Sequence, residues 1–272
     1  MYNVSELVKR KCKNMNKKEI RKEYKLEKKS ARKEYKLEKK GLREEYEKKL
    51  DAFYQEKGVN PKDFPPRRSV LEEIGNAVTH GVGSIFSIVA FILMLTHAND
   101  TKEVISACLY FFGLFILFTM SCLYHAFPYG SKVKKVFRRF DYSSIYLLIG
   151  STFAPILLSY LGGTYGIVFS IIQWTLIIAG ISLVGVFGPG HLRFIHIPLY
   201  FILGWSALLF LPKMFKNDLG FFMWLLAGGL AYSFGIIPFA IDKKVSHFIW
   251  HFFVLIGAIV QWFGIYLYIY LV

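Results

Sequence analysis

Apolar residues dominate the chain from residue 73 to its end, and only short polar, glycine- or proline-containing segments interrupt them. A membrane-spanning helix needs about 20 predominantly apolar residues to cross a hydrocarbon core of about 30 Å. Runs of that length predict seven membrane-spanning helices. The predicted spans cover residues 73–95, 104–126, 141–160, 165–187, 193–211, 220–241 and 247–271.

The first 70 residues have the opposite character. They hold 23 of the 34 Lys and Arg residues and 12 of the 19 acidic residues, which leaves 11 basic and 7 acidic residues for the rest of the chain. A stretch so long and so poor in charge is not compatible with a water-soluble domain. The distribution therefore predicts an all-α membrane protein, with a seven-helix membrane domain in residues 70–272 and a basic N-terminal extension.

The extension, residues 1–57, contains an internal repeat. RKEYKLEKK occurs at residues 21–29 and 32–40, and a degraded copy, REEYEKKL, at 43–50. Because 11 residues make about three helical turns, Tyr24, Tyr35 and Tyr46 fall on one slowly drifting line of a helix.

Like-charged i,i+4 pairs and a shortage of apolar residues predict that the extension is partly helical or disordered. Two interpretations of its role stay open. It is a solvated basic tail, or residues 17–50 bind a partner, either anionic lipid headgroups or nucleic acid.

A linker, residues 58–69, follows the extension and contains three prolines that stop a continuous helix. At its end, Ser69 and Glu72 have the spacing of a capping box, which predicts a helix start immediately before the first apolar run.

Basic residues in the short loops predict the orientation in the cell membrane. They gather in the loops after the second and sixth spans, at Lys132, Lys134, Lys135, Arg138, Arg139, Lys243 and Lys244. We therefore expect a multi-pass protein with a cytoplasmic N-terminus and a C-terminus outside.

Polar side chains inside the predicted spans gather at one depth, near the cytoplasmic edge. They are Asn76, Thr79 and His80 in the first span, Ser121 and His125 in the second, Asp141 in the third, and His247 and His251 in the seventh. Ionisable residues are expensive in a bilayer, so each is a candidate for a functional role.

The histidines predict a metal site. His247 and His251 are four residues apart, so their imidazoles face the same side of a helix, about 6 Å apart. His125 is the candidate for a third ligand, and three histidines with one open position are typical of a catalytic zinc. Asp141 is then the general base or orienting group for the attacking water, and Ser121 bonds that water or a substrate carbonyl.

Simpler interpretations of the same residues stay open. The histidine pair is equally compatible with hydrogen bonds between helices, and His125 with a place at the membrane interface. Asp141 follows two arginines and would also stabilise the positive end of the third span.

Several segments together resemble the hemolysin III family, the bacterial branch of the progestin and adipoQ receptor superfamily. They are EEIGNAVTHGVG (72–83), SCLYHAF (121–127), FDYSSIYLLIGSTFAPI (140–156), GGLAYSFGIIPFA (228–240) and DKKVSHFIWH (242–251). The resemblance implies seven helices with an inside N-terminus. It also implies Zn²⁺ held by His125, His247 and His251, with Asp141 and Ser121 at the family's aspartate and serine positions. Glu73, Asn76, Thr79 and His80 match the first-helix motif and are expected to support the ligands.

Three functions are compatible with this resemblance. The first is a zinc-dependent hydrolase of lipid amides or esters within the membrane. The second is a membrane-lytic or pore-forming hemolysin in which the zinc is structural. The third, a seven-helix receptor, ranks last because the sequence offers no extracellular domain for a large ligand.

Overall fold

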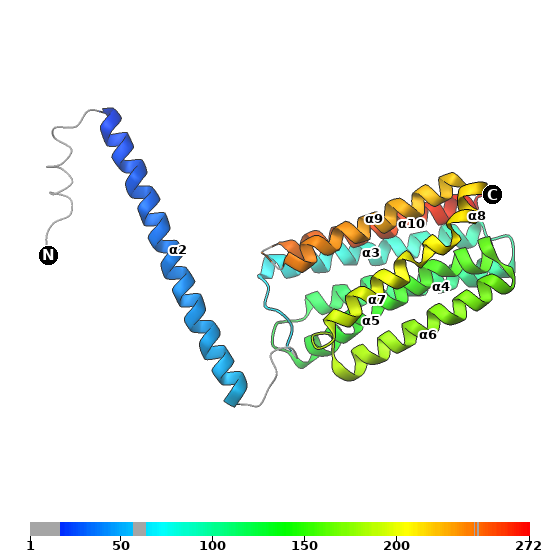
Figure 1. The fold of residues 1–272 in the computed structure, drawn as a ribbon, viewed down its shortest axis with the longest axis horizontal. Helices are drawn as coiled ribbons and strands as arrows, with labels where there is room; N and C mark the ends of the chain where they lie inside the picture. The colour runs from blue at the N-terminus through cyan, green and yellow to red at the C-terminus, as the bar shows by residue number, and fades with distance from the viewer. Residues whose placement is uncertain (1–16, 57–63, 242, 244) are drawn as a thin grey trace. The chain divides into compact units, whose positions relative to one another are not determined.

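The computed structural model describes residues 17–56, 64–241, 243 and 245–272. Contacts within the chain divide it into two units, Met1–Pro61 and Lys62–Val272. Residues 57–63, which include half of the predicted linker, lie outside the described residues. In the first unit, Lys17–Glu56 form a single helix, α2, without interruption (Figure 1).

The second unit is a helical bundle, and no strand occurs among the described residues. Its elements are α3 (Val70–Thr96), α4 (Thr101–Ala126), α5 (Lys132–Ala154) continued by the π-helical η2 (Pro155–Leu161), α6 (Gly163–Phe187), α7 (Arg193–Trp205), η3 (Ser206–Phe210), α8 (Leu211–Asn217), α9 (Leu219–Ile241), and α10 (Ser246–Ile265) continued by η4 (Tyr266–Tyr270). Within the described residues, seven spans are long and apolar enough to cross a membrane. The predicted all-α, seven-span architecture is confirmed.

Successive helices run in opposite directions along the bundle (Figure 1). The closest packing joins α3 to α4, α4 to α5 and α9 to α10, and α10 also packs against α3. The last span therefore lies beside the first. This arrangement brings the start of α10 to the same end of the bundle as the start of α3 and the end of α4.

Polar side chains define where several helices begin. The hydroxyl of Ser69 accepts a hydrogen bond from the backbone of Glu72, so the predicted start of the first span is confirmed. The side chains of Asp100 and Ser131 likewise accept hydrogen bonds from backbone N–H groups in the first turns of α4 and α5. Each cap satisfies one of the backbone donors that the first turn of a helix leaves without a partner.

Two predicted spans differ from the structure. The third helix begins at Lys132 and not at residue 141, because Ser131 caps it and the basic residues continue the helix. The fifth span does not end at residue 211 but continues to Lys216. Pro212 lies in the first turn of α8, where a missing backbone donor costs nothing.

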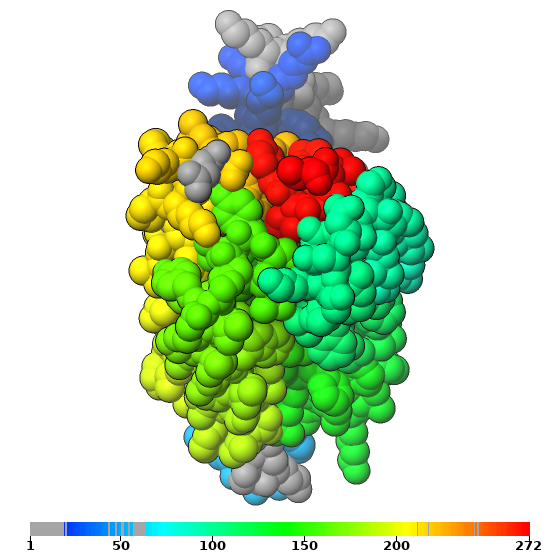
Figure 2. Space-filling view, turned by 90° about the vertical axis from the view of Figure 1, so that its right-hand side faces the viewer, coloured from blue at the N-terminus to red at the C-terminus, as the bar shows by residue number. Residues whose placement is uncertain are grey.

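The opposite end of the bundle carries the C-terminus, which lies beside the connection between α3 and α4 (Figures 1 and 2). The Tyr270 hydroxyl donates to the carbonyl of Glu103 at 2.9 Å, and the Tyr266 hydroxyl lies 3.1 Å from Nδ1 of His97. These bonds fix η4 against the start of α4 and the end of α3 at this surface.

Candidate metal site

Three histidines from two helices converge at one end of the bundle. The Nε2 atom of His247 lies 3.3 Å from Nε2 of His125 and 3.2 Å from Nε2 of His251. All three side chains are buried, and their ligand atoms lie within 4.8 Å of one another. The group that the sequence predicted as metal ligands is therefore brought together by the fold.

The spacing of these nitrogens fits a tetrahedral metal ion. Metal–nitrogen bonds of about 2.0–2.1 Å in tetrahedral geometry separate the nitrogens by roughly 3.3–3.4 Å. Two of the three separations, 3.2 and 3.3 Å, match that requirement, and the third pair, His125 and His251, lies within 4.8 Å. Three histidine ligands leave one coordination position of a tetrahedron open, so this group could hold a metal ion with an exchangeable site.

A carboxylate orients the first of these candidate ligands. Oε2 of Glu73, in the first turn of α3, lies 2.5 Å from Nδ1 of His125. Because a carboxylate accepts hydrogen bonds, Nδ1 carries the proton, and the lone pair of His125 is left on Nε2, the atom that faces the other histidines. Nδ2 of Asn76 lies 3.3 Å from the same Nδ1 and packs against the ring. Both groups carry hydrogens in this tautomer, so the contact is not a hydrogen bond.

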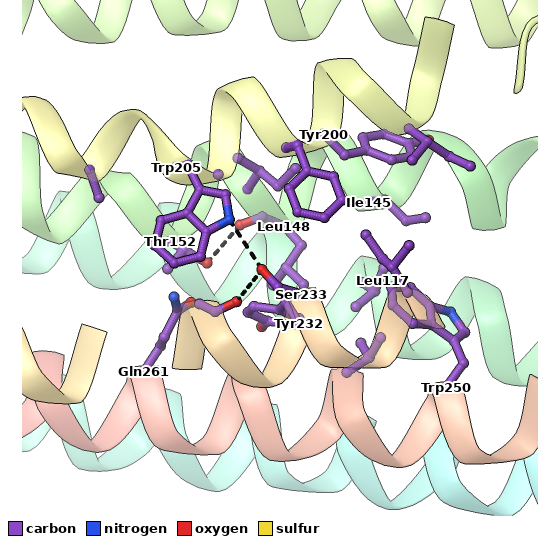
Figure 3. Close-up of a pocket in the computed structure, with 18 of the residues that line it drawn as sticks. Leu117, Ile145, Leu148, Thr152, Tyr200, Trp205, Tyr232, Ser233, Trp250 and Gln261 are labelled. Atoms are coloured by element: carbon purple, nitrogen blue, oxygen red, sulfur yellow. Dashed lines mark hydrogen bonds between the residues drawn. The ribbon is translucent and has the colours of Figure 1, made fainter. Parts of the chain in front are cut away.

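A cavity of about 170 Å³ begins at the histidines and extends along the bundle. Ser121, Asp141, His247 and His251 line one end of it, and the Ser121 hydroxyl interacts with the Asp141 carboxylate. The remaining lining is mostly apolar and comes from α5, α7, α9 and α10 (Figure 3).

Comparison with known proteins agrees with the motifs. A family model described as Haemolysin-III related matches residues 68–262. The chain belongs to the hemolysin III family. The resemblance that the sequence motifs predicted is thus confirmed, and the matched residues include every candidate site residue but not α2.

Individual relatives match over the same region. Hemolysin-3 of Bacillus cereus is 39% identical over 207 residues, which cover 74% of this chain and 93% of the relative. The hemolysin-3 homolog of Bacillus subtilis (strain 168) is 32% identical over 206 residues, which cover 74% of this chain and 95% of the relative. The human monocyte to macrophage differentiation factor is 30% identical over 205 residues, which cover 73% of this chain and 85% of the relative.

Lys134 is a component of this hemolysin III site that the sequence prediction missed. Its Nζ lies 3.2 Å from Oε1 of Glu73 and donates to the carbonyls of Tyr124 and Phe127, each at 2.9 Å. The ammonium group thus uses its three hydrogens on Glu73 and on the carbonyl end of α4. The sequence interpretation placed Lys134 in a loop, but it is fully buried in the first turn of α5.

The other first-helix residues have different contacts. The ring of His80 stacks on His251, with 3.8 Å between centroids and 28° between planes. The Thr79 hydroxyl donates to the carbonyl of Gly75 in its own helix at 2.7 Å. His80 therefore packs against a candidate ligand, whereas the bond that Thr79 makes to Gly75 lies within α3. Their predicted supporting roles stay predictions.

His196 lies in the interior of the bundle, although nothing in the local sequence singles it out. It is buried in α7, lines the cavity, and its Nδ1 lies 2.9 Å from the hydroxyl of Tyr146. Arg193, one turn earlier, also lines the cavity and donates to the carbonyl of Phe239. No local motif marks these residues, because their neighbours come from α5 and α9.

Proposed function

We propose that this protein is an intramembrane zinc-dependent hydrolase that cleaves amide or ester bonds of lipids. The observation that carries the proposal is the three-histidine group with an open fourth position, beside a carboxylate at the end of an apolar cavity. Structural zinc sites are normally closed by four protein ligands, so an open set of three favours catalysis.

The donor set favours zinc among the common metals. Neutral imidazole suits Zn²⁺, and a tetrahedral nitrogen arrangement agrees with it. A zinc ion held by His125, His247 and His251 would polarise a substrate carbonyl and lower the pKa of an attacking water to about 7.

The residues around the histidines have separate roles in this proposal. Asp141 accepts the proton of the attacking water as the new C–O bond forms, and returns it to the leaving amine or alkoxide as the C–N or C–O bond breaks. Ser121, which interacts with Asp141, orients that carboxylate. Glu73 holds the ring of His125 by accepting the proton of its Nδ1, and Asn76 packs beside that nitrogen.

The shape of the cavity supports a lipid substrate. On α10 its lining runs from His247 to Gln261, which is about 21 Å along the helix axis. Tyr232, Trp250 and Val254 line the length between them. An apolar channel of this length suits an acyl chain whose carbonyl carbon lies at the histidine end.

We also propose that the site lies on the cytoplasmic side, with the N-terminus inside. Lys132, Lys135, Arg139 and Lys243 all lie at the end of the bundle that carries the histidines, either at the start of α5 or beside the start of α10. Positive charge in short connections favours the cytoplasm.

The proposal is tested by measuring metal content and hydrolysis on detergent-purified protein. Wild type should contain one zinc per chain and hydrolyse a long-chain lipid amide or ester, and a chelator should abolish both. Asp141→Asn should keep the zinc but lose activity by about 10²-fold or more, the size expected for a positioned acid–base group. Zinc-loaded wild type without turnover of any long-chain amide or ester would reject the hydrolase.

The matched pair for this test is His247→Ala and His191→Ala. His191 lies in the connection between α6 and α7 and is absent from the three-histidine group, so its substitution should change neither zinc nor turnover. Loss of zinc in both variants would show that the histidine group is not the specific site.

Membrane lysis with a structural metal is the second candidate. The observation that favours it is the name of the Bacillus cereus relative, Hemolysin-3. Purified protein that lyses vesicles equally well with and without its zinc ligands would support lysis over hydrolysis.

A further inference from the structure

The helix α2 carries an apolar stripe with a regular spacing. Seven residues alternate at intervals of four and seven: Ile20, Tyr24, Ala31, Tyr35, Leu42, Tyr46 and Phe53. Four plus seven residues make an 11-residue repeat, which advances only about 20° around a helix in each copy. The stripe therefore follows one face of α2 over about 50 Å.

The stripe is open to the surroundings. Tyr24, Tyr35, Leu42 and Tyr46 each expose more than half of their surface. Lys28 and Lys39 lie four residues after the first two tyrosines, and their ammonium groups lie 5.7 and 5.8 Å from the tyrosine ring centroids. A run of large exposed side chains on one face of a long helix is typical of an interaction surface.

Charges of opposite sign flank the stripe on its two sides. At 100° per residue, one flank carries Glu23, Glu27, Glu34, Glu38 and Glu45. The other flank carries Arg21, Lys25, Lys28, Arg32, Lys36 and Lys39. Segregation into an acidic row and a basic row provides the charge complementarity that a helix pair needs.

Symmetry decides which pairing these rows favour. In a parallel pair related by a twofold axis, the acidic row of one helix faces the basic row of the other on both sides of the stripe. In an antiparallel pair, acidic faces acidic and basic faces basic. A parallel pair also agrees with how the membrane domains insert. Two copies with the same orientation in a bilayer have their α2 helices on the same side of the membrane.

An anionic lipid surface is a poorer match. A helix that lies on its tyrosine stripe places both flanking rows at the surface together, and the five glutamates of one row oppose the attraction of the six basic residues of the other.

We propose that α2 pairs with α2 of a second copy of this chain, in parallel and in register, as a two-stranded coiled coil. Its 11-residue repeat gives 3.67 residues per turn, which selects a right-handed supercoil. The paired stripes cover the tyrosines, and the flanking rows form two sets of ion pairs. The inference concerns assembly and does not depend on the proposed hydrolase.

The direction of pairing is tested with single cysteines in the full-length protein in membranes. Cys12, Cys108 and Cys122 are first replaced by Ser, and one cysteine is then introduced by Tyr24→Cys or by Tyr46→Cys. Each variant should form disulfide-linked dimers with its own kind. Lys33→Cys, on the opposite face of α2, is the control and should not.

Two outcomes of this experiment overturn the proposal. Crosslinking only in mixtures of the Tyr24→Cys and Tyr46→Cys chains indicates an antiparallel pair. Equal crosslinking at positions 24 and 33, or none at either stripe position, excludes a specific stripe interface.

Charge reversal separates pairing from lipid binding. The acidic-row variant Glu27→Lys, Glu34→Lys, Glu38→Lys makes both flanks basic, and it should reduce crosslinking at Tyr46→Cys by about tenfold or more. Co-expression with Lys25→Glu, Arg32→Glu, Lys36→Glu should restore mixed dimers. If crosslinking is unchanged and the acidic-row variant instead binds phosphatidylglycerol vesicles more strongly than wild type, α2 is a lipid-binding arm and the proposal is wrong.

Discussion

Nδ1 of His125, on α4, lies 2.5 Å from Oε2 of Glu73, on α3, and this contact connects two spans at the candidate metal site. The other oxygen of the same carboxylate lies 3.2 Å from the ammonium of Lys134 on α5. A single partly buried carboxylate thus joins three helices. The position of the first candidate ligand is consequently coupled to the packing of the bundle.

We predict that Glu73→Gln weakens metal binding by about 10- to 100-fold, the effect usual for a partner that orients a histidine ligand. Glutamine is similar in size, but it accepts a weaker hydrogen bond and no longer favours the proton on Nδ1 of His125. Metal affinity of the purified protein, measured by competition with a chelating dye, checks this. Glu72→Gln, one residue earlier, is the control, and an equal loss in both variants would contradict the specific role of Glu73.

We predict that Lys134→Met lowers thermal stability by about 3 kcal/mol, because it leaves the Glu73 carboxylate and two helix-end carbonyls without their buried cation. The melting temperature in detergent is the measurement. Lys132→Met, an exposed residue in the same turn, should have little effect. A Lys134→Met variant as stable as wild type would show that the buried ammonium is not a structural requirement.

His80 and His251 are stacked histidines with different predicted roles, and substitution separates them. His251→Ala should lose the metal, since it removes a ligand. His80→Phe should keep one metal per chain, because a phenyl ring preserves the stacking. The metal content of the two purified variants tests this difference. Loss of metal from His80→Phe would contradict a packing role and indicate that His80 is itself a ligand.

Gly113 marks the close approach of α4 and α5. A β-carbon there would overlap with the Ser151 side chain and lie 2.8 Å from the carbonyl of Leu147. Gly113→Ala should therefore destabilise the bundle by about 1–3 kcal/mol. Gly185→Ala on α6 meets no atom within 4 Å and should be neutral or slightly stabilising. Thermal unfolding in detergent compares them, and equal stability would show that α5 shifts to accommodate the methyl group.

Much of the membrane fold could be predicted because its signals are local. Each of three features depends only on the residues of one helix: the apolar length of a span, the Ser69 cap, and the spacing of His247 and His251. Their physical basis is bilayer thickness and helical periodicity, neither of which depends on distant contacts. The same is true of the repeat that places tyrosines on one line of α2.

Prediction from the local sequence failed at the start of α5. Five basic residues at 132–139 suggested a loop, since charge is usual outside the bilayer. Lys134 is nevertheless helical and buried, because the ends of α3 and α4 provide a carboxylate and free carbonyls for it. Partners 10 and 61 residues away in sequence stabilise the charge, and no pattern within the segment reveals them.

The sequence by itself determined the class of protein, the number of spans, the family and the candidate ligands, since hydrophobic length and motif residues are properties of the chain. Only the tertiary structure decided that three Nε2 atoms meet at 3.2 and 3.3 Å, that Glu73 links His125 to Lys134, and that His196 lines the cavity. These relationships depend on which helices lie side by side and on how each is rotated. Packing between helices sets both, and that packing is a property of the whole bundle.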